Sequence, residues 1–589
     1  MKPARRILAV LLCAALLIGV LCACASTAGT DADTDTNDDS VAQQLYDTPV
    51  AAPDLTNATE ITLSGTDDVT ITSGGVYVLT GTLTDGRVLV NAPDADVTLV
   101  LQDADITCSD SSALYIYKAA SVLLYLPDGT ASTLTDGSSY DYSDSVSSAA
   151  AEEPNACLYA KSDLIIAGGG TLTVTGNANN GITGKDTLKI EDTAVSVTAA
   201  NHGINGKDCL VLKQANVTVT SGGDALRATN DSDSALGCVL IGASTLTLTA
   251  GEDGIQAETT LTLFDTACTV TSGGGSSAAL AGDTSAKGIK AGTDITVRSG
   301  SCTLDCADDA VHANSNVTVS GGTFTVTTGD DGVHADNAVT ITDGTIDIPK
   351  CYEGIEGQTI TISGGTIDIV SSDDGLNAAG GADQSGFGGR GPDSFGGSSD
   401  SRITISGGTL RIDAGGDGID SNGDLIVSGG EIYVSGPTSD GDSAIDYDGT
   451  ATVTGGTVIA AGYSGMAQNF GADSTQGSIL LTSRSTSTEP IRVTDASGSV
   501  LAEFTPAKAY TCVIVSTPAL KQGGTYTVTM GGESTDVTLE SLIYGTGGMG
   551  GGMGGQPGGN MGTPPDENGG GSMGTPPDGN GGKGSRPGQ

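Results

Sequence analysis

The sequence predicts an all-β fold, a parallel β-helix in which coils of about 22 residues stack into a solenoid. The stretch from Cys302 to Ala378 repeats one pattern four times: an alternating strand, an acidic pair or its equivalent, a small-apolar pair and another alternating strand. Fixed self-similarity is typical of solenoids, in which a repeat buries its apolar face only against its neighbours. The marker residues of the repeat, at spacings of 22, 22 and 21, are Val311, Val333, Ile355 and Leu376.

Each repeat has the composition of short strands. Apolar residues alternate with Thr, as in FTV at 324–326 and VTI at 339–341, so one face of each strand points inward. A helical repeat is disfavoured because β-branched residues dominate and glycine interrupts every unit. We expect the β-helix to span residues 55–476, because the marker recurs at Ile182, Ile204, Leu226, Ile255, Ile289, Ile419 and Ile445.

The N-terminus has the pattern of a targeting segment. Basic residues precede an apolar run from Ile7 to Leu21, and the run ends in LCAC, which resembles the lipobox of bacterial lipoproteins. We predict a signal peptide at 1–24, a lipid on Cys24 and a location on the extracellular face of the cell membrane. Plain secretion is the alternative. The acidic residues 25–54 are expected to form a disordered, solvated tether.

The two ends of the β-helix are expected to be capped. From Asn57 to Thr135 the strands are present but the period is irregular, which is typical of an N-terminal cap that protects an open edge. Residues 477–544 lose the period and indicate a small antiparallel C-terminal β cap. The Gly-rich insertion 380–401 and the Gly-, Pro- and Met-rich tail 545–589 are expected to be flexible.

The formal net charge of −47 excludes binding to nucleic acid or an anionic membrane by charge alone. Nine cysteines lie outside the signal segment without CxxC spacing, so a zinc site is not expected. Cys268 and Cys302 occupy an inward column of adjacent coils, where we expect small core residues and leave a disulfide open. We expect a monomer.

A column of acidic residues is the candidate metal site. The residue before each small-apolar pair is expected to point outward, so Asp309, Asp331, Glu353 and Asp374 would form a ladder with a spacing of about 4.8 Å. Such neighbours repel unless a cation intervenes, and Ca²⁺ takes roughly six to eight oxygens. The alternative is that these residues only shape turns. The predicted Ca²⁺ ligands are Asp308, Asp309, Asp330, Asp331, Asp336, Glu353, Glu356, Asp373, Asp374 and Asp417.

Basic and aromatic residues border this ladder. A mixed face could hold a sugar acid, with calcium against its carboxylate and Lys or Arg against its other oxygens. The alternative is that these basic and aromatic residues are solvent-exposed surface residues that bind no ligand. The predicted carbohydrate-binding residues are Lys287, Lys290, Arg298, His312, His334 and Tyr352.

Long motifs carry a family resemblance that covers roughly residues 55–540. GGDALRATND, AGEDGIQAETTLTL, DDAVHANSNVTVSGG and YEGIEGQTITISGGTIDIVSSDDGLNAAGG resemble a family of bacterial secreted carbohydrate-binding proteins. The resemblance implies a right-handed parallel β-helix similar to polysaccharide lyases such as pectate lyases. It also implies bound calcium, a cell-surface location, and binding of cellulose or acidic plant polysaccharides such as polygalacturonate.

Two functions follow as the leading hypotheses. The first is a surface-anchored binding protein for plant cell-wall polysaccharide, and the second is a calcium-dependent lyase with Lys290 or Lys287 as base. A two-carboxylate glycosidase and a ligand-free adhesin rank below them. With no Trp and scattered Tyr, the chain lacks an aromatic strip for crystalline cellulose, which favours an acidic glycan. Whether the protein is an enzyme is left open.

Overall fold

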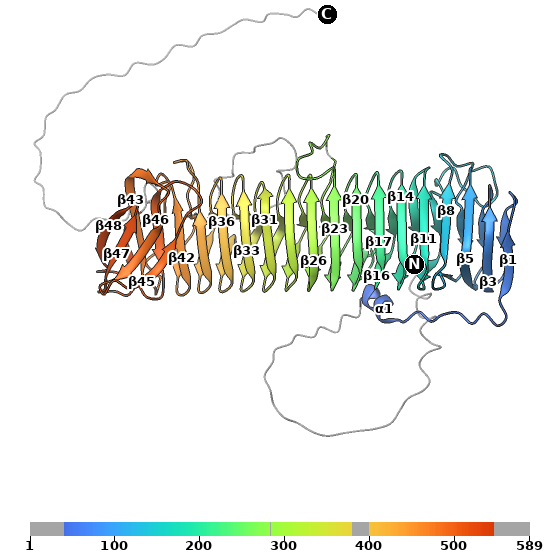
Figure 1. Ribbon diagram of the computed structural model, residues 1–589, viewed down its shortest axis with the longest axis horizontal. Coiled ribbons are helices and arrows are strands. Elements are labelled where there is room, and N and C mark those ends of the chain that lie inside the picture. Colours follow the sequence, from blue (N-terminus) through green and yellow to red (C-terminus); the bar gives the residue numbers. More distant parts are fainter. Residues whose placement is uncertain (1–39, 283, 380–399, 547–589) are drawn as a thin grey trace, which may run out of the picture.

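The structure is a computed structural model that describes residues 40–282, 284–379 and 400–546. These residues are nearly all β, with one helix and a long stack of parallel strands (Figure 1). The predicted signal peptide 1–24 with Cys24, most of the 380–401 insertion and nearly all of the tail 545–589 lie outside the described residues.

The parallel strands form three ladders, each running along the stack. The first ladder contains the marker residues, except that Ile445 lies directly before its last strand. It consists of β2 (Val69–Ile71), β4 (Val88–Asn91), β6 (Leu114–Lys118), β9 (Ala156–Ala160), β12 (Asn180–Gly184), β15 (Ile204–Gly206), β18 (Leu226–Ala228), β21 (Ile255–Ala257), β24 (Ile289–Ala291), β27 (Val311–Ala313), β30 (Val333–Ile341), β32 (Ile355–Ile362), β34 (Leu376–Ala378), β37 (Ile419–Ser421) and β40 (Asp446–Tyr447).

The second ladder begins with β1 (Thr59–Leu63), β3 (Gly75–Leu83) and β5 (Asp96–Cys108), and includes the second halves of β30 and β32. Its other strands are β7 (Ser121–Tyr125), β10 (Asp163–Ala167), β13 (Thr187–Glu191), β16 (Cys209–Lys213), β19 (Cys238–Gly242), β22 (Leu261–Phe264), β25 (Asp294–Val297), β28 (Asn316–Val319), β35 (Arg402–Ile405), β38 (Asp424–Val427) and β41 (Ala451–Val453).

The third ladder continues from the end of β5. It consists of β8 (Ala131–Asp136), β11 (Thr171–Gly176), β14 (Ala194–Ala199), β17 (Asn216–Ser221), β20 (Thr245–Ala250), β23 (Thr266–Ser272), β26 (Gly300–Cys306), β29 (Thr323–Thr328), β31 (Thr345–Cys351), β33 (Thr366–Ser371), β36 (Thr409–Ala414), β39 (Glu431–Ser435) and β42 (Thr457–Gly462).

The marker residues align as the period predicts. Val311 pairs with Val333, Val333 with Ile355, and Ile355 with Leu376. All four side chains are buried in one hydrophobic core that runs along the stack. Alternating burial in the third-ladder strands leaves their Thr residues largely on the outer face, as in TLTLTA of β20.

Antiparallel strands close the C-terminal end of the stack. β46 (Tyr510–Ser516) pairs with β42 and with β43 (Ser478–Ser487), which also contacts β49 (Ile543–Tyr544). A separate four-stranded sheet consists of β44 (Ile491–Asp495), β45 (Val500–Phe504), β47 (Thr525–Met530) and β48 (Glu533–Thr538). Among the described residues, no helix is long and apolar enough to span a bilayer.

The expectation of a disordered, solvated tether over 25–54 is wrong for residues 41–47, which form a helix. Helix α1 (Val41–Asp47) packs on β16 and β19, with Ala42 buried beside Cys209 and Cys238. Tyr46 meets Phe264 edge-on at 5.1 Å. At the C-terminal end of α1, Lys213 Nζ donates to Tyr46 O at 3.0 Å. A cation is favourable at this position because the C-terminal end of a helix carries partial negative charge. Docking against the stack supplies the apolar contacts that the segment lacks by itself.

The cysteines follow the register of the ladders. Cys268 pairs with Cys302 across β23 and β26, and both are buried with free thiols, which confirms them as core residues. A disulfide instead joins Cys209 to Cys238 on β16 and β19. Their separation of 29 residues includes the extra loop before β19, which conceals their alignment in the sequence.

Candidate functional site

The acidic column lies in the turns that lead into the first ladder. We call its members rung residues, each two positions before a first-ladder strand: Asp224, Asp253, Lys287, Asp309, Asp331, Glu353, Asp374 and Asp417. Most of these turns repeat one hydrogen bond, in which a rung carboxylate accepts the backbone N–H of the next rung. Asp309 Oδ1 accepts from Asp331 at 3.1 Å, and Asp331 Oδ1 accepts from Glu353 at 3.3 Å.

The expected outward orientation is wrong for the first part of this column. Asp309 and Asp331 are 0% and 1% exposed, because their side chains lie along the stack to satisfy backbone donors of the next turn. Asp374, which accepts from Asp417 at 2.6 Å, is half-buried. The turn-shaping alternative therefore describes a real role of these carboxylates.

The N-terminal part of the column carries its own cations. Lys287 Nζ lies 3.1 Å from Asp308 Oδ1 and 2.5 Å from Asp309 Oδ2, and His312 Nδ1 lies 2.8 Å from Asp309 Oδ2. Burial opposes the charge of Lys287, but the two carboxylates outweigh it and raise its pKa. Burial likewise opposes ionisation of Asp309, but Lys287 and His312 lower its pKa. Lys287 is thus held as an ammonium ion, which is unfavourable for a general base.

His334 neutralises the next turn. Its Nδ1 lies 2.7 Å from Glu356 Oε2 and 3.3 Å from Asp331 Oδ2, and its Nε2 lies 3.2 Å from Asp336 Oδ1. Burial opposes protonation, but hydrogen bonds to Asp331 and Glu356 raise the pKa of His334 to about 12. The ring also stacks on His312 with centroids 4.8 Å apart. The two histidines therefore belong to a buried polar network, which makes them poor sugar contacts.

The electrostatics of the C-terminal part of the column are different. Burial and the charges of neighbouring carboxylates raise the pKa of Asp374 well above its usual range and that of Asp417 to about 8. Burial also raises the pKa of Glu353, which accepts from Asn377 Nδ2 at 2.8 Å. Among the ion pairs of the described residues, none joins Asp374 or Asp417 to Lys, Arg or His.

The structure brings the predicted ligands together in three groups, each with ligand atoms within 4.8 Å of one another. Asp308, Asp309 and Asp330 form one, and Asp331, His334 and Glu356 a second, but both adjoin cations or a protonated histidine. The third consists of Asp374, Asp417 and Asp420. Its donors are all oxygens and half-buried, and burial and like charge raise the pKa values of Asp374 and Asp417, so the group fits the hard cation Ca²⁺. Of the predicted ligands, Asp336, Glu353 and Asp373 lie outside these groups.

Asp420 is absent from the predicted ligands. It follows the rung by three residues and aligns with Asn377, which in turn aligns with Glu356. This second column changes from Glu to Asn to Asp along the stack. The return from Asn377 to a carboxylate three residues after Asp417 is the sequence signal that identifies Asp420 as a ligand candidate.

Of the six predicted carbohydrate-binding residues, Lys290 lines a surface depression. Lys287, His312 and His334 are buried in ion pairs, and Arg298 lies beyond the end of β25, outside the column. Tyr352 is half-buried beside rung Glu353. The depression has a volume of about 590 Å³ and is lined by His202, Asp224, Arg227, Glu252, Asp253, Gln256, Thr284, Ser285 and Lys290.

Part of the chain is similar to proteins described as carbohydrate-binding. A family model described as "Carbohydrate-binding domain-containing protein" matches residues 65–332. This stretch of the chain resembles a carbohydrate-binding family. It contains the depression, whereas Asp374, Asp417 and Asp420 follow it. A relative from Acetivibrio thermocellus with the same description is 38% identical over 133 residues, which are 22% of this chain and 45% of that protein. The match thus spans less than half of the relative's length.

A solved structure is also similar in part. It is described as the polysaccharide lyase-like protein from C. thermocellum, in a gadolinium derivative. The identity is 31%, the match covers 37% of this chain and 91% of the other, and the TM-score is 0.35.

Proposed function

We propose that this protein binds an acidic polysaccharide of plant cell walls, such as polygalacturonate, through Ca²⁺ held by Asp374, Asp417 and Asp420. The observation that carries the proposal is the close approach of these three half-buried carboxylates, in turns where burial and neighbouring carboxylates raise the pKa of Asp417 to about 8. A divalent ion would relieve their repulsion and leave coordination positions for a sugar carboxylate. The family match to carbohydrate-binding proteins supports the ligand class.

In this proposal calcium bridges the carboxylates of the protein and those of the polysaccharide. A chain with a formal net charge of −47 repels a polyuronate, so a cation must bridge the two sets of carboxylates. Asp374, Asp417 and Asp420 would hold the ion, and the rung hydrogen bond from Asp417 N–H to Asp374 Oδ1 would fix their spacing. We further propose that the coils close into a right-handed parallel β-helix and that the protein acts as a monomer.

We also propose that a lipid on Cys24 anchors the protein to the extracellular face of the membrane. Replacement of the acylated cysteine removes the attachment point, so Cys24→Ser is expected to move the protein from the membrane fraction to the medium or to leave an uncleaved precursor. Soluble mature protein with an unmodified N-terminus beyond residue 24 would contradict the anchor.

The test of binding is affinity electrophoresis of the full chain in gels that contain polygalacturonate. We expect retention with Ca²⁺, its loss with EDTA, and no recovery with NaCl at equal ionic strength, because monovalent salt only screens. Asp374→Asn together with Asp417→Asn should abolish the retention. Asp347→Asn, at an exposed position of β31, is the matched control and should retain it. Retention that persists in EDTA would contradict the proposal.

The lyase alternative has one favouring observation. Lys290 Nζ lies at the depression and is partly exposed, although it pairs with Asp253 Oδ2 at 3.2 Å. A lyase would produce an unsaturated uronide whose ultraviolet absorbance rises with time, and Lys290→Ala would abolish it. We expect retention without that absorbance.

A further inference from the structure

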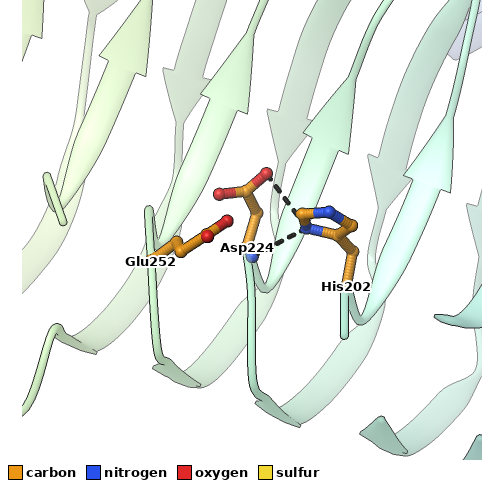
Figure 2. A group of neighbouring side chains, drawn as sticks. All are labelled: His202, Asp224 and Glu252. Carbon is orange, nitrogen blue, oxygen red and sulfur yellow. Dashed lines mark hydrogen bonds and ion pairs between the residues drawn. The ribbon is translucent and has the colours of Figure 1, made fainter. Parts of the chain in front are cut away.

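The depression around Arg227 is lined by the turns before β15, β18, β21 and β24 and by residues of the last three strands, away from Asp374 and Asp417. Figure 2 shows three of its side chains, with His202, Asp224 and Glu252 reaching toward one another from successive turns. Its volume of about 590 Å³ is in the range of small-molecule sites, roughly 300–1,000 Å³.

Several of its polar groups retain unused hydrogen-bonding capacity. Arg227 Nε is buried without a hydrogen-bond partner, although its NH1 lies 3.4 Å from Asp224 Oδ2. In the described part of the chain, the side chains of Glu252 and Gln256 make no hydrogen bond. A buried donor without a partner is unfavourable unless a ligand or water satisfies it. Three planar groups thus line the same depression: the Arg227 guanidinium is a donor, the Glu252 carboxylate is an acceptor, and the Gln256 amide is both.

The charges of the hollow disfavour an ionic ligand. Three carboxylates, on Asp224, Glu252 and Asp253, would repel an anion, and the cations of Arg227 and Lys290 would repel a metal ion. The His202, Asp224 and Glu252 group has ligand atoms within 4.8 Å of one another. However, His202 Nδ1 is already engaged by Asp224, since it accepts the backbone N–H at 2.9 Å and lies 3.2 Å from the carboxylate Oδ2. With Nδ1 as the acceptor of that N–H, the ring proton lies on Nε2, which offers the depression a donor.

We infer that this depression is a binding subsite for a neutral sugar residue, one whose hydroxyls both donate and accept. The Arg227 guanidinium, on a side chain that is 21% exposed, and His202 Nε2 donate to ring or hydroxyl oxygens, Glu252 accepts from hydroxyls, and the Gln256 amide does both. Lys290 is held between Asp253 Oδ2 at 3.2 Å and Ser285 Oγ at 3.0 Å, and so forms one wall.

The subsite and the acidic group lie on one line of the stack. Pairings between successive first-ladder strands connect Arg227 to Gln256, Gln256 to Lys290, and onward through the second column to Asp420. These seven pairings, at about 4.8 Å each, separate Arg227 from Asp420 by roughly 34 Å along the stack. This inference extends the proposed function, since a glycan along that line would reach both sites, but binding here requires no metal.

The test measures neutral oligosaccharides binding to the full chain in EDTA. Hexasaccharides of β-1,4-glucan, xylan, mannan and arabinan would be titrated by calorimetry. We expect at least one to bind, and Glu252→Gln and Gln256→Ala to weaken it at least tenfold. Glu431→Gln repeats the acid-to-amide change at an exposed position of β39 and should alter affinity less than twofold. Calcium-dependent retention by polygalacturonate should be unchanged in Glu252→Gln.

Three outcomes would overturn the inference. The first is that none of the four oligosaccharides binds in EDTA. The second is that an oligosaccharide binds but both subsite variants bind it as tightly as the wild type. The third is stoichiometric binding of Zn²⁺ or Ca²⁺ that Glu252→Gln abolishes, which would assign His202, Asp224 and Glu252 to a metal site. Failure of the proposed calcium site would appear separately, as lost polygalacturonate retention with neutral-sugar binding preserved.

Discussion

Asp374 Oδ1 accepts the backbone N–H of Asp417 at 2.6 Å, so the repeat itself holds two carboxylates in adjacent turns. The same link ties Asp224 to Asp253 at 3.1 Å, but Arg227 lies beside Asp224. The same backbone hydrogen bond thus occurs in two electrostatic environments: His202 and Arg227 lower the pKa of Asp224, whereas burial and neighbouring carboxylates raise that of Asp417.

Asp417→Asn should lower Ca²⁺ affinity at least tenfold, because it removes one anionic ligand while its amide oxygen can still accept the Ser443 N–H. Titration calorimetry measures the effect. Asp224→Asn is the matched control, since this rung has the same backbone role beside Arg227, and should leave affinity within twofold. Equal effects of the two changes would show that the acidic group holds no calcium.

In EDTA, Asp417→Asn should be more stable than the wild type near neutral pH. The folded-state pKa of Asp417 is raised to about 8 from 3.8, so the folded protein binds the proton more tightly and the wild type loses stability as pH rises between these values. The difference should therefore be absent below pH 3.8 and grow toward pH 8. Chemical denaturation at several pH values checks it, and a constant difference would contradict it.

Calcium should raise the thermal midpoint of the wild type. A ligand that binds only the folded state adds about 2.7 kcal/mol at a hundredfold excess over Kd. Calorimetric melts with Ca²⁺ and with EDTA measure the shift, and a variant with both Asp374→Asn and Asp417→Asn should show none. An equal shift in that variant would place the calcium elsewhere.

Lys287→Met should destabilise the fold by about 3–5 kcal/mol, because it leaves the buried carboxylates of Asp308 and Asp309 without their ammonium partner. Adding Asp309→Asn should recover part of this loss. Arg492→Met breaks an ion pair with Glu503 whose side chains are about half exposed, and should cost less than about 1 kcal/mol. Denaturant unfolding distinguishes these cases, and similar losses for the two single variants would refute the buried ion pair.

Glu153 should contribute stability that acid removes. Its carboxylate lies 2.6 Å from Lys161 Nζ and 3.1 Å from Lys185 Nζ. Burial opposes ionisation, but these partners lower the pKa of Glu153 to about 2. Its contribution is complete above the unfolded-state pKa of 4.5 and is lost as pH falls toward 2. The stability difference from Glu153→Gln, about 1–3 kcal/mol at pH 6, should shrink across that window. A pH-independent difference would contradict the pairing.

The sequence alone determined the period, the alternating faces and the alignment of one coil with the next. These are local properties, because a strand alternates its side chains with a period of two and a solenoid contacts only neighbouring coils. The alignment of Val311 with Val333 and Ile355 therefore follows from counting residues, and so does the vertical alignment of Asp309, Asp331 and Glu353.

The tertiary structure decided the direction of the side chains and the pairing of the charges. The geometry of the turn, which the spacing of the repeat does not specify, directs the Asp309 side chain along the stack and places Lys287 against it. From the sequence pattern we expected Asp309 to face outward and Lys287 to contact a sugar. Docking of α1 and the Cys209–Cys238 disulfide depend on contacts between segments far apart in the chain. Repeats specify register, because register is periodic, but the charge balance of a turn depends on single residues in neighbouring coils. For this reason only the folded stack separates Asp309, which pairs with Lys287 and His312, from Asp374 and Asp417, which pair with no cation of the described residues.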